Sequence, residues 1–147
     1  MICVDANVVA KLLFGEEQDS DKATALVDAC TNAREIIVAP ALLPFEVTNI
    51  VRRRMLRDGL LLARARLVLA QFQAFEISLR SFADLHARAL ILASQFDLRA
   101  SYDAHYVVLA QENACNLWTA DDKLVRASRG RLPFVRSLAN YSPLESF

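Results

Sequence analysis

Short apolar segments alternate with longer segments of helical periodicity along the chain, and this alternation is the strongest constraint on the fold. The periodic segments include one with apolar residues at Leu43, Val47, Ile50 and Val51. The apolar segments read as strands at residues 2–4, 34–40, 75–79 and 115–119, with a further edge strand expected in residues 131–138. Strands that alternate with helices imply a parallel sheet covered on both faces. We therefore predict a three-layer α/β/α fold with a central parallel sheet of four or five strands.

Helix boundaries are expected where capping residues and helix breakers occur. The helix that begins near residue 41 should end at Asp58-Gly59, because glycine is common just beyond a helix end. Pro44 falls in its first turn, where proline is tolerated. Three other helices are expected to have side-chain caps, at Ser20 or Asp21, at Ser81 and at Ser101.

Composition and length indicate one globular domain over residues 1–147, without repeats or linkers. The chain is 54% apolar and 23% charged, which argues against disordered and fibrous proteins. Asp5 and Lys11 interrupt the first apolar run, so we expect no secretory signal, no membrane segment and a cytoplasmic location. The three scattered cysteines, Cys3, Cys30 and Cys115, are expected to be free thiols in the core.

Four acidic residues are predicted to gather at the carboxyl edge of the sheet, where ligands of such folds bind. Asp5 and Asp121 directly follow strands, and Glu46 and Asp103 lie in the first turns of helices. Taken singly, Asp103 and Asp121 are also explained as helix starters and Asp5 as a turn residue. Together, ionised carboxylates repel one another unless a cation compensates. The set therefore predicts an all-oxygen site for Mg²⁺ or Mn²⁺.

The two histidines are expected to be structural or on the surface, outside this metal site. His105 lies two residues from Asp103, about 200° around the helix, and so faces another direction. His86 has no acidic partner visible in the sequence. Phe14 and Trp118 lie in apolar runs and are expected in the core rather than against bases.

Four segments, VDANVVAKLL, PFEVTNIVRR, SYDAHYVVLA and LWTADDKL, resemble the four acidic motifs of PIN-domain ribonucleases, and most closely those of VapC-type toxins. Their order and spacing agree over nearly the whole chain. The resemblance implies a PIN-like fold and a Mg²⁺ (or Mn²⁺) site formed by Asp5, Glu46, Asp103 and Asp121. It also implies supporting roles for Asn7 and Thr119. Asp122 competes with Asp121 for the fourth acidic position.

This resemblance implies a metal-dependent endoribonuclease that leaves a 5′-phosphate and a 3′-hydroxyl. Asp5 and Asp103 would be the direct ligands, with Glu46 and Asp121 acting through water or orienting the attacking water. It further implies a small VapB-like antitoxin that occludes the acidic pocket with an arginine that reaches the carboxylates, and a homodimer.

RNA contacts are expected from the arginines, which make up 14 of the 17 basic residues. The formal net charge is zero, so any surface for RNA must come from local segregation of charge. Arg52 and Arg53 follow Glu46 on one helix and are the first candidates. Further arginines near the motifs are Arg54, Arg57, Arg64, Arg66, Arg126, Arg129, Arg131 and Arg136.

Two other functions remain open from the residues alone. A phosphatase of the aspartyl-nucleophile type would need a second aspartate two residues after Asp5, where this chain has Asn7. A catalytically silent module with the same fold would bind metal or RNA without turnover. The presence of all four acids argues against the silent module.

Overall fold

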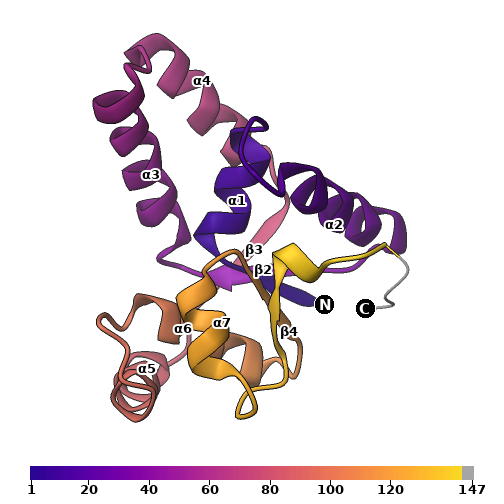
Figure 1. Cartoon of the computed structure of the whole chain (residues 1–147), viewed down its shortest axis with the longest axis vertical. Coiled ribbons are helices and arrows are strands. Elements are labelled where there is room, and N and C mark those ends of the chain that lie inside the picture. Colours follow the sequence, from indigo (N-terminus) through magenta and orange to yellow (C-terminus); the bar gives the residue numbers. More distant parts are fainter. Residues whose placement is uncertain (144–147) are drawn as a thin grey trace.

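The computed structural model describes residues 1–143, which form one five-stranded parallel sheet with helices on both sides (Figure 1). The strands are β1 (Ile2–Val4), β2 (Ile37–Pro40), β3 (Ile77–Arg80), β4 (Asn116–Thr119) and β5 (Val135–Ser137). Their order across the sheet is β3-β2-β1-β4-β5, and every neighbouring pair is parallel. The predicted three-layer α/β fold is confirmed, with five strands and β5 at an edge. The predicted domain extends to residue 147, and residues 144–147 lie outside the described range.

The helices divide into two groups, one on each face of the sheet (Figure 1). The first group is α1 (Ala6–Leu13), α2 (Ser20–Ala33), α3 (Leu43–Asp58) and α4 (Leu62–Gln73). The second is α5 (Leu85–Gln95), α6 (Tyr102–Glu112) and α7 (Asp122–Ser128), and a 3₁₀ turn at Leu138–Asn140 follows β5. Because crossovers between parallel strands are right-handed, connections that run in opposite directions across the sheet place their helices on opposite faces.

The direction of these connections reverses between β1 and β4, which creates a crevice beyond their carboxyl ends. Val4 is paired with Trp118 in the register of the two strands. The backbone N–H of Asp5 donates to the carbonyl of Trp118 at 3.2 Å. Asp5 and Thr119 are thereby held side by side at this edge of the sheet.

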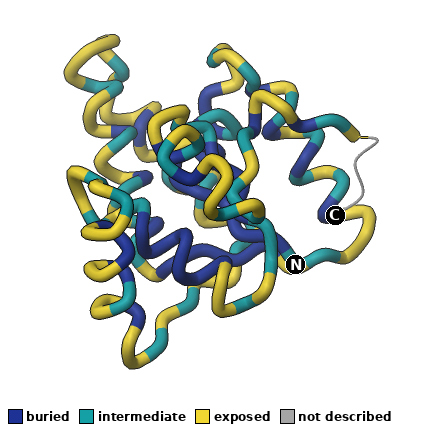
Figure 2. The backbone as a smooth tube through the Cα atoms, turned by 60° about the horizontal axis from the view of Figure 1, so that its bottom comes forward, coloured by how far each residue is buried: buried dark blue, intermediate teal, exposed yellow. Residues whose placement is uncertain are grey.

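The core contains the central strands and the middle of α6. Figure 2 shows the buried stretches running through the interior and the exposed ones around it. Residues 104–110 of α6 are all buried, so packing in the core fixes the helix that carries Asp103 in its first turn. Phe14 and Trp118 belong to the core, as predicted. The three cysteines are free, with Cys115 less buried than the other two.

The three predicted side-chain caps are wrong, although the helices themselves are present and one of them starts where predicted. Helix α2 begins at Ser20 itself, with Asp19 before it in the left-handed region and no side-chain cap. The Ser20 hydroxyl instead donates to the carbonyls of Phe14 and Glu17, because the preceding turn folds back onto it. Helix α5 begins at Leu85, beyond the predicted cap Ser81. Ser101 occupies the cap position of α6, but its side chain makes no capping hydrogen bond.

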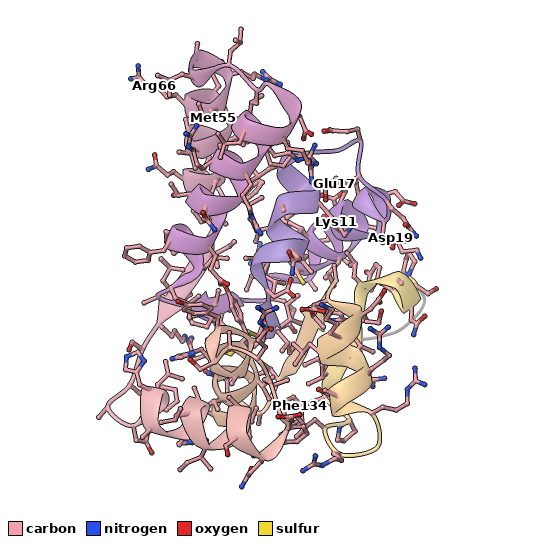
Figure 3. All side chains as sticks on the ribbon, turned by 60° about the vertical axis from the view of Figure 1, so that its left-hand side comes forward. Lys11, Glu17, Asp19, Met55, Arg66 and Phe134 are labelled. Carbon is pink, nitrogen blue, oxygen red and sulfur yellow. The ribbon has the colours of Figure 1, made fainter. Side chains whose placement is uncertain are left out.

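The α3–α4 hairpin extends from the body of the molecule, and Arg54, near the end of α3, links it to the segment that follows α1. The Arg54 guanidinium lies 4.5 Å from the centre of the Phe14 ring and pairs with Glu16, Glu17 and Asp58. Gly59 ends α3 in the left-handed conformation, as predicted (φ 70°). Figure 3 labels Glu17, in the segment between α1 and α2, and Arg66, which lies farther out on the hairpin. Over residues 1–143, no helix combines the length and apolar character that crossing a bilayer would require.

Candidate functional site

Asp5 lies directly beyond β1 and caps α1 with its side chain. Oδ1 accepts a hydrogen bond from the Val8 N–H at 2.8 Å, and Oδ2 accepts one from the Thr119 hydroxyl. The residue is only 4% exposed. The pKa of Asp5 is raised to about 7: burial is the main cause, the charges of Asp103 and Asp121 add to the rise, and the two hydrogen bonds oppose it. The ionised form is therefore costly without a compensating charge.

Glu46 lies in the first turn of α3, across the crevice from Asp5. Its Oε2 accepts a hydrogen bond from the Tyr106 hydroxyl at 2.5 Å. Burial raises the pKa of Glu46 and the nearby Asp103 adds to the rise, whereas the Tyr106 hydrogen bond and Arg53 lower it. Sequence reasoning missed Tyr106. The available signal was its spacing of three residues from Asp103, which places both side chains on one helical face.

Asp103 and Asp121 complete the acidic set from the starts of α6 and α7. Asp103 lies in the first turn of α6, where burial and the charge of Asp121 raise its pKa. Asp121 caps α7, accepting hydrogen bonds from the N–H groups of Lys123 and Leu124 at 2.7 and 3.3 Å. Its own N–H donates to Thr119 Oγ1 at 2.9 Å. Thr119 thus links Asp5 to Asp121.

Of the two adjacent acids, Asp121 is the better candidate for the fourth acidic position. Asp121 acts electrostatically on both Asp5 and Asp103, whereas Asp122 is exposed in the first turn of α7. The cap geometry explains the difference. A cap side chain turns back over the helix start, and the next residue points outward.

Three of the four acids, Asp5, Glu46 and Asp103, line one open cavity of about 600 Å³. Asn7 and Tyr106 also line it, so the expected supporting asparagine lies beside the acids. Asp121 acts on this group by charge but is outside the cavity lining. The structure therefore brings together residues that are up to 116 positions apart in the chain.

The candidate RNA-binding arginines separate into two kinds. Arg53 lines the cavity, and Arg52 is exposed outside it. Arg54 is engaged in ion pairs near the end of α3, and Arg57 pairs with Asp58. Helical geometry produces this separation because adjacent residues point about 100° apart around the axis.

The histidines lie outside the acidic cavity, as predicted. His105 Nδ1 is 2.7 Å from the carbonyl oxygen of Ser101, and its Nε2 is 2.9 Å from His86 Nδ1. His105 is buried and faces α5, whereas His86 is exposed. The cavity lining is thus free of imidazole and thiol groups over the described residues.

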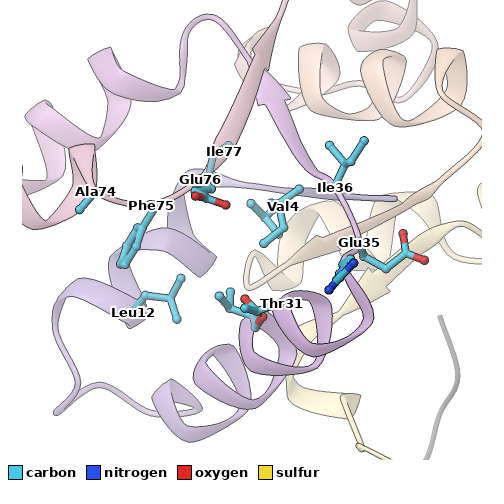
Figure 4. Close-up of a pocket in the computed structure, with 12 residues that line it drawn as sticks. Val4, Leu12, Thr31, Glu35, Ile36, Ala74, Phe75, Glu76 and Ile77 are labelled. Atoms are coloured by element: carbon cyan, nitrogen blue, oxygen red, sulfur yellow. The ribbon is translucent and has the colours of Figure 1, made fainter.

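A second cavity, of about 680 Å³, lies on the sheet face covered by α1, α2 and α4 (Figure 4). Its lining is mainly apolar and includes Val4, Leu12 and Phe75. Glu35 and Glu76 are its two acids, and Glu35 pairs with the N-terminal ammonium group. This cavity lacks a gathered set of carboxylates and is distinct from the acidic cavity.

The donor chemistry of the acidic cavity fits a hard divalent cation. Its charged donors are carboxylate oxygens, which Mg²⁺ and Mn²⁺ prefer, and neighbouring negative charges raise the pKa values of the acids. Across residues 1–143, however, no group of three or more Asp, Glu, His or Cys side chains is arranged so as to hold a metal ion. The side chains are near one another without forming a closed ligand shell.

Comparison with known proteins agrees with this architecture. The chain is similar to the crystal structure of PAE2754 from Pyrobaculum aerophilum, with 21% identity, a TM-score of 0.64, and coverage of 94% of this chain and 90% of that one. At this identity the likeness concerns the fold. A search of the curated proteins finds no match. A family model for the PIN domain matches residues 2–130, a span that includes all four acids. PIN domains are generally metal-dependent nucleases, and this chain belongs to the PIN domain family.

Proposed function

We propose that the chain is a metal-dependent endoribonuclease of the VapC toxin type, which hydrolyses RNA phosphodiester bonds. One observation carries the proposal: Asp5, Glu46 and Asp103 share one cavity in which burial and mutual repulsion raise all three pKa values. Carboxylates kept in such surroundings reduce stability, so their arrangement is best explained by a cationic ligand.

In this proposal Asp5 and Asp103 hold Mg²⁺ or Mn²⁺, and Glu46 and Asp121 complete the site through water. Such an ion would lower the pKa of a bound water and neutralise negative charge on the phosphodiester. Mg²⁺ commonly uses one or two carboxylates and keeps several waters, so a closed set of three protein ligands is not required.

The surrounding residues orient these carboxylates. The Thr119 hydroxyl and the Val8 N–H each donate a hydrogen bond to one oxygen of Asp5. These bonds fix the orientation of the carboxylate and therefore the direction of its remaining lone pairs. The Tyr106 hydroxyl holds Oε2 of Glu46 in the same way. Asn7 is exposed at the cavity wall and supplies a hydrogen bond to water or phosphate. Partners of this kind limit side-chain rotation and typically affect metal affinity strongly.

The proposal is tested by RNA cleavage in Mn²⁺ or Mg²⁺, with the native chain compared with Asp5→Asn and Asp103→Asn. Asp122→Asn is the matched control, because it removes a neighbouring exposed acid that is outside the cavity lining. We expect cleavage by the native chain and the control, loss in the two site variants, and products with a 5′-phosphate and a 3′-hydroxyl. Equal cleavage by the native chain and Asp5→Asn would refute the proposed site.

A catalytically silent module with the same fold is the second candidate, and the lack of a three-ligand set in the described residues favours its RNA-binding form. This function predicts RNA or metal binding without cleavage by any of the variants. The same assay, joined to a binding measurement, separates the two candidates. Trapping of a phosphoaspartate at Asp5 would instead support the phosphatase alternative.

The partners in this proposal are an RNA substrate, a VapB-like antitoxin and a second copy of the chain in a homodimer, all in the cytoplasm. An antitoxin that inhibits this site would bring basic groups to the acidic cavity, because carboxylates bind arginine strongly. Co-expression with the protein from the neighbouring reading frame tests the antitoxin, and light scattering tests the dimer. Sequencing of RNA ends after brief induction identifies the target RNA.

A further inference from the structure

Two aromatic rings on the wall of the acidic cavity are exposed to solvent. Phe45 is 78% exposed and Tyr102 is 61% exposed, and both line the cavity. They are the two exposed aromatic residues within residues 1–143, since the others are buried or half-buried. Burial of a large aromatic side chain normally contributes to stability, so rings left in water beside a site indicate a contact with a partner.

Neither ring is covered by a neighbouring group. Phe14, Phe82 and Phe96 each have an arginine guanidinium over the ring. Within the described part of the chain, Phe45 and Tyr102 have no such cation and no contact with another aromatic ring. Most of the surface of each ring is therefore open to solvent and accessible to a planar group.

Both rings occupy equivalent places beside the acids. Phe45 directly precedes Glu46 in the first turn of α3, and Tyr102 directly precedes Asp103 in the first turn of α6. These two helices lie on opposite faces of the sheet (Figure 1). The cavity wall thus carries one exposed ring from each side of the molecule, with the carboxylates between the two helices.

We propose that Phe45 and Tyr102 are positioning residues that stack on unpaired bases of single-stranded RNA. This inference rests on the proposed nuclease function, which puts a phosphodiester at Asp5 and Asp103. Arg53 lines the same wall and contributes a phosphate contact. The positive charge of Arg53 also lowers the pKa of Glu46.

The chemistry selects unpaired RNA over duplex RNA. Bases in a duplex are paired and stacked on their neighbours, and their faces are inaccessible to a side chain. Every unpaired base offers a π-face, so stacking tolerates different sequences. The substrate class is therefore a single-stranded segment or loop, and the two rings discriminate its structure rather than its sequence.

Binding is the direct test, measured by fluorescence anisotropy in an Asp103→Asn background so that cleavage does not interfere. The probes are a single-stranded RNA oligomer and an RNA duplex. Phe45→Ala and Tyr102→Ala should each weaken single-strand binding about 5- to 100-fold, with little change for the duplex. Phe45→Trp and Tyr102→Phe should retain binding. Leu90→Ala is the control, because Leu90 is equally exposed (67%) on α5 and outside the cavity lining.

Two further readouts separate stacking from a general structural effect. The salt dependence of binding should be unchanged in the alanine variants of the rings, whereas Arg53→Ala should reduce its slope by about one. One abasic position in the oligomer should weaken binding to the parent chain and have a smaller additional effect in Phe45→Ala, because the two changes remove the same contact.

Unchanged single-strand affinity in both alanine variants, or an equal loss for the duplex, would overturn the stacking proposal. Unchanged RNA affinity with reduced self-association would overturn it as well and assign the rings to a protein interface. The two proposals fail separately. Stacking without any cleavage by the native chain contradicts the nuclease proposal alone, and cleavage without the ring effects contradicts the stacking proposal alone.

Discussion

Replacement of Asp5 by asparagine is expected to stabilise the metal-free protein at neutral and alkaline pH. The wild-type carboxylate is 4% exposed and lies near the charges of Asp103 and Asp121. Asparagine is nearly isosteric and retains an oxygen that accepts the Val8 N–H, so the cap of α1 survives. The Thr119 hydroxyl can remain a hydrogen-bond partner of the amide. The substitution therefore removes the charge and keeps most of the packing.

The magnitude follows from the pKa of Asp5, which is raised from the ordinary 3.8 to about 7 by burial. Between these values the folded protein holds a proton that the unfolded chain has released, so the contribution of Asp5 to stability is lost as pH rises. The full loss is about 4 kcal/mol, at about 1.4 kcal/mol for each pH unit. Between about pH 5 and pH 8, the advantage of Asp5→Asn over wild type should grow by about 2–3 kcal/mol.

Urea denaturation in EDTA at several pH values measures this difference directly, because only the titration of Asp5 distinguishes the two proteins. Asp122→Asn, at an exposed position, should show a difference from wild type that does not vary with pH. Millimolar Mg²⁺ should narrow the advantage of Asp5→Asn, since a bound cation stabilises the ionised carboxylate. If the difference in free energy of unfolding between Asp5→Asn and wild type stays constant or decreases from acidic to alkaline pH, the reasoning is refuted.

Three other substitutions follow from the same contacts. Tyr106→Phe removes the donor to Glu46 and should lower the free energy of unfolding by about 1–2 kcal/mol at alkaline pH, with a smaller loss at acidic pH, because the hydrogen bond favours the ionised form of Glu46. Denaturation of Tyr106→Phe with an equal loss at both pH values would argue against this account. Thr119→Val should weaken Mn²⁺ binding, measured by calorimetry, about tenfold or more, whereas Thr119→Ser should retain the affinity. Equal Mn²⁺ affinities of the wild type and both variants would contradict a role for the hydroxyl. Arg54→Ala should lower the free energy of unfolding by about 1–2 kcal/mol, because it removes the cover of Phe14 and several ion pairs, whereas the exposed Arg57→Ala should leave it unchanged.

Much of the fold was predictable because it depends on local patterns. Buried strands such as Ile2–Val4 are continuous apolar runs, and the helices between them repeat apolar residues at helical spacing. Right-handed crossovers then leave few arrangements for such an alternation. The helix starts were less predictable. Ser20 bonds to the turn before α2, and the segment after Ser81 does not enter its helix until Leu85, both of which depend on how the loops fold.

The acidic set was recognisable in the sequence by its position after strands and at helix starts, but its neighbours were not. Tyr106 reads as one more residue of an apolar run, and only packing turns its hydroxyl onto Glu46. The exposure of Phe45 and Tyr102 also depends on the fold, which leaves both rings in water. The choice between Asp121 and Asp122 likewise depends on which side chain caps α7.

The sequence by itself determined the order of strands and helices and the identity of the acids, because these depend on residue type and spacing along the chain. Tertiary structure decided which side chains share the cavity, which arginine faces it and how far each carboxylate is buried. These properties arise from contacts between residues such as Asp5 and Thr119, which are 114 positions apart in the chain. Electrostatic interactions depend on distance in space and on the surrounding dielectric, and neither can be determined from the local sequence.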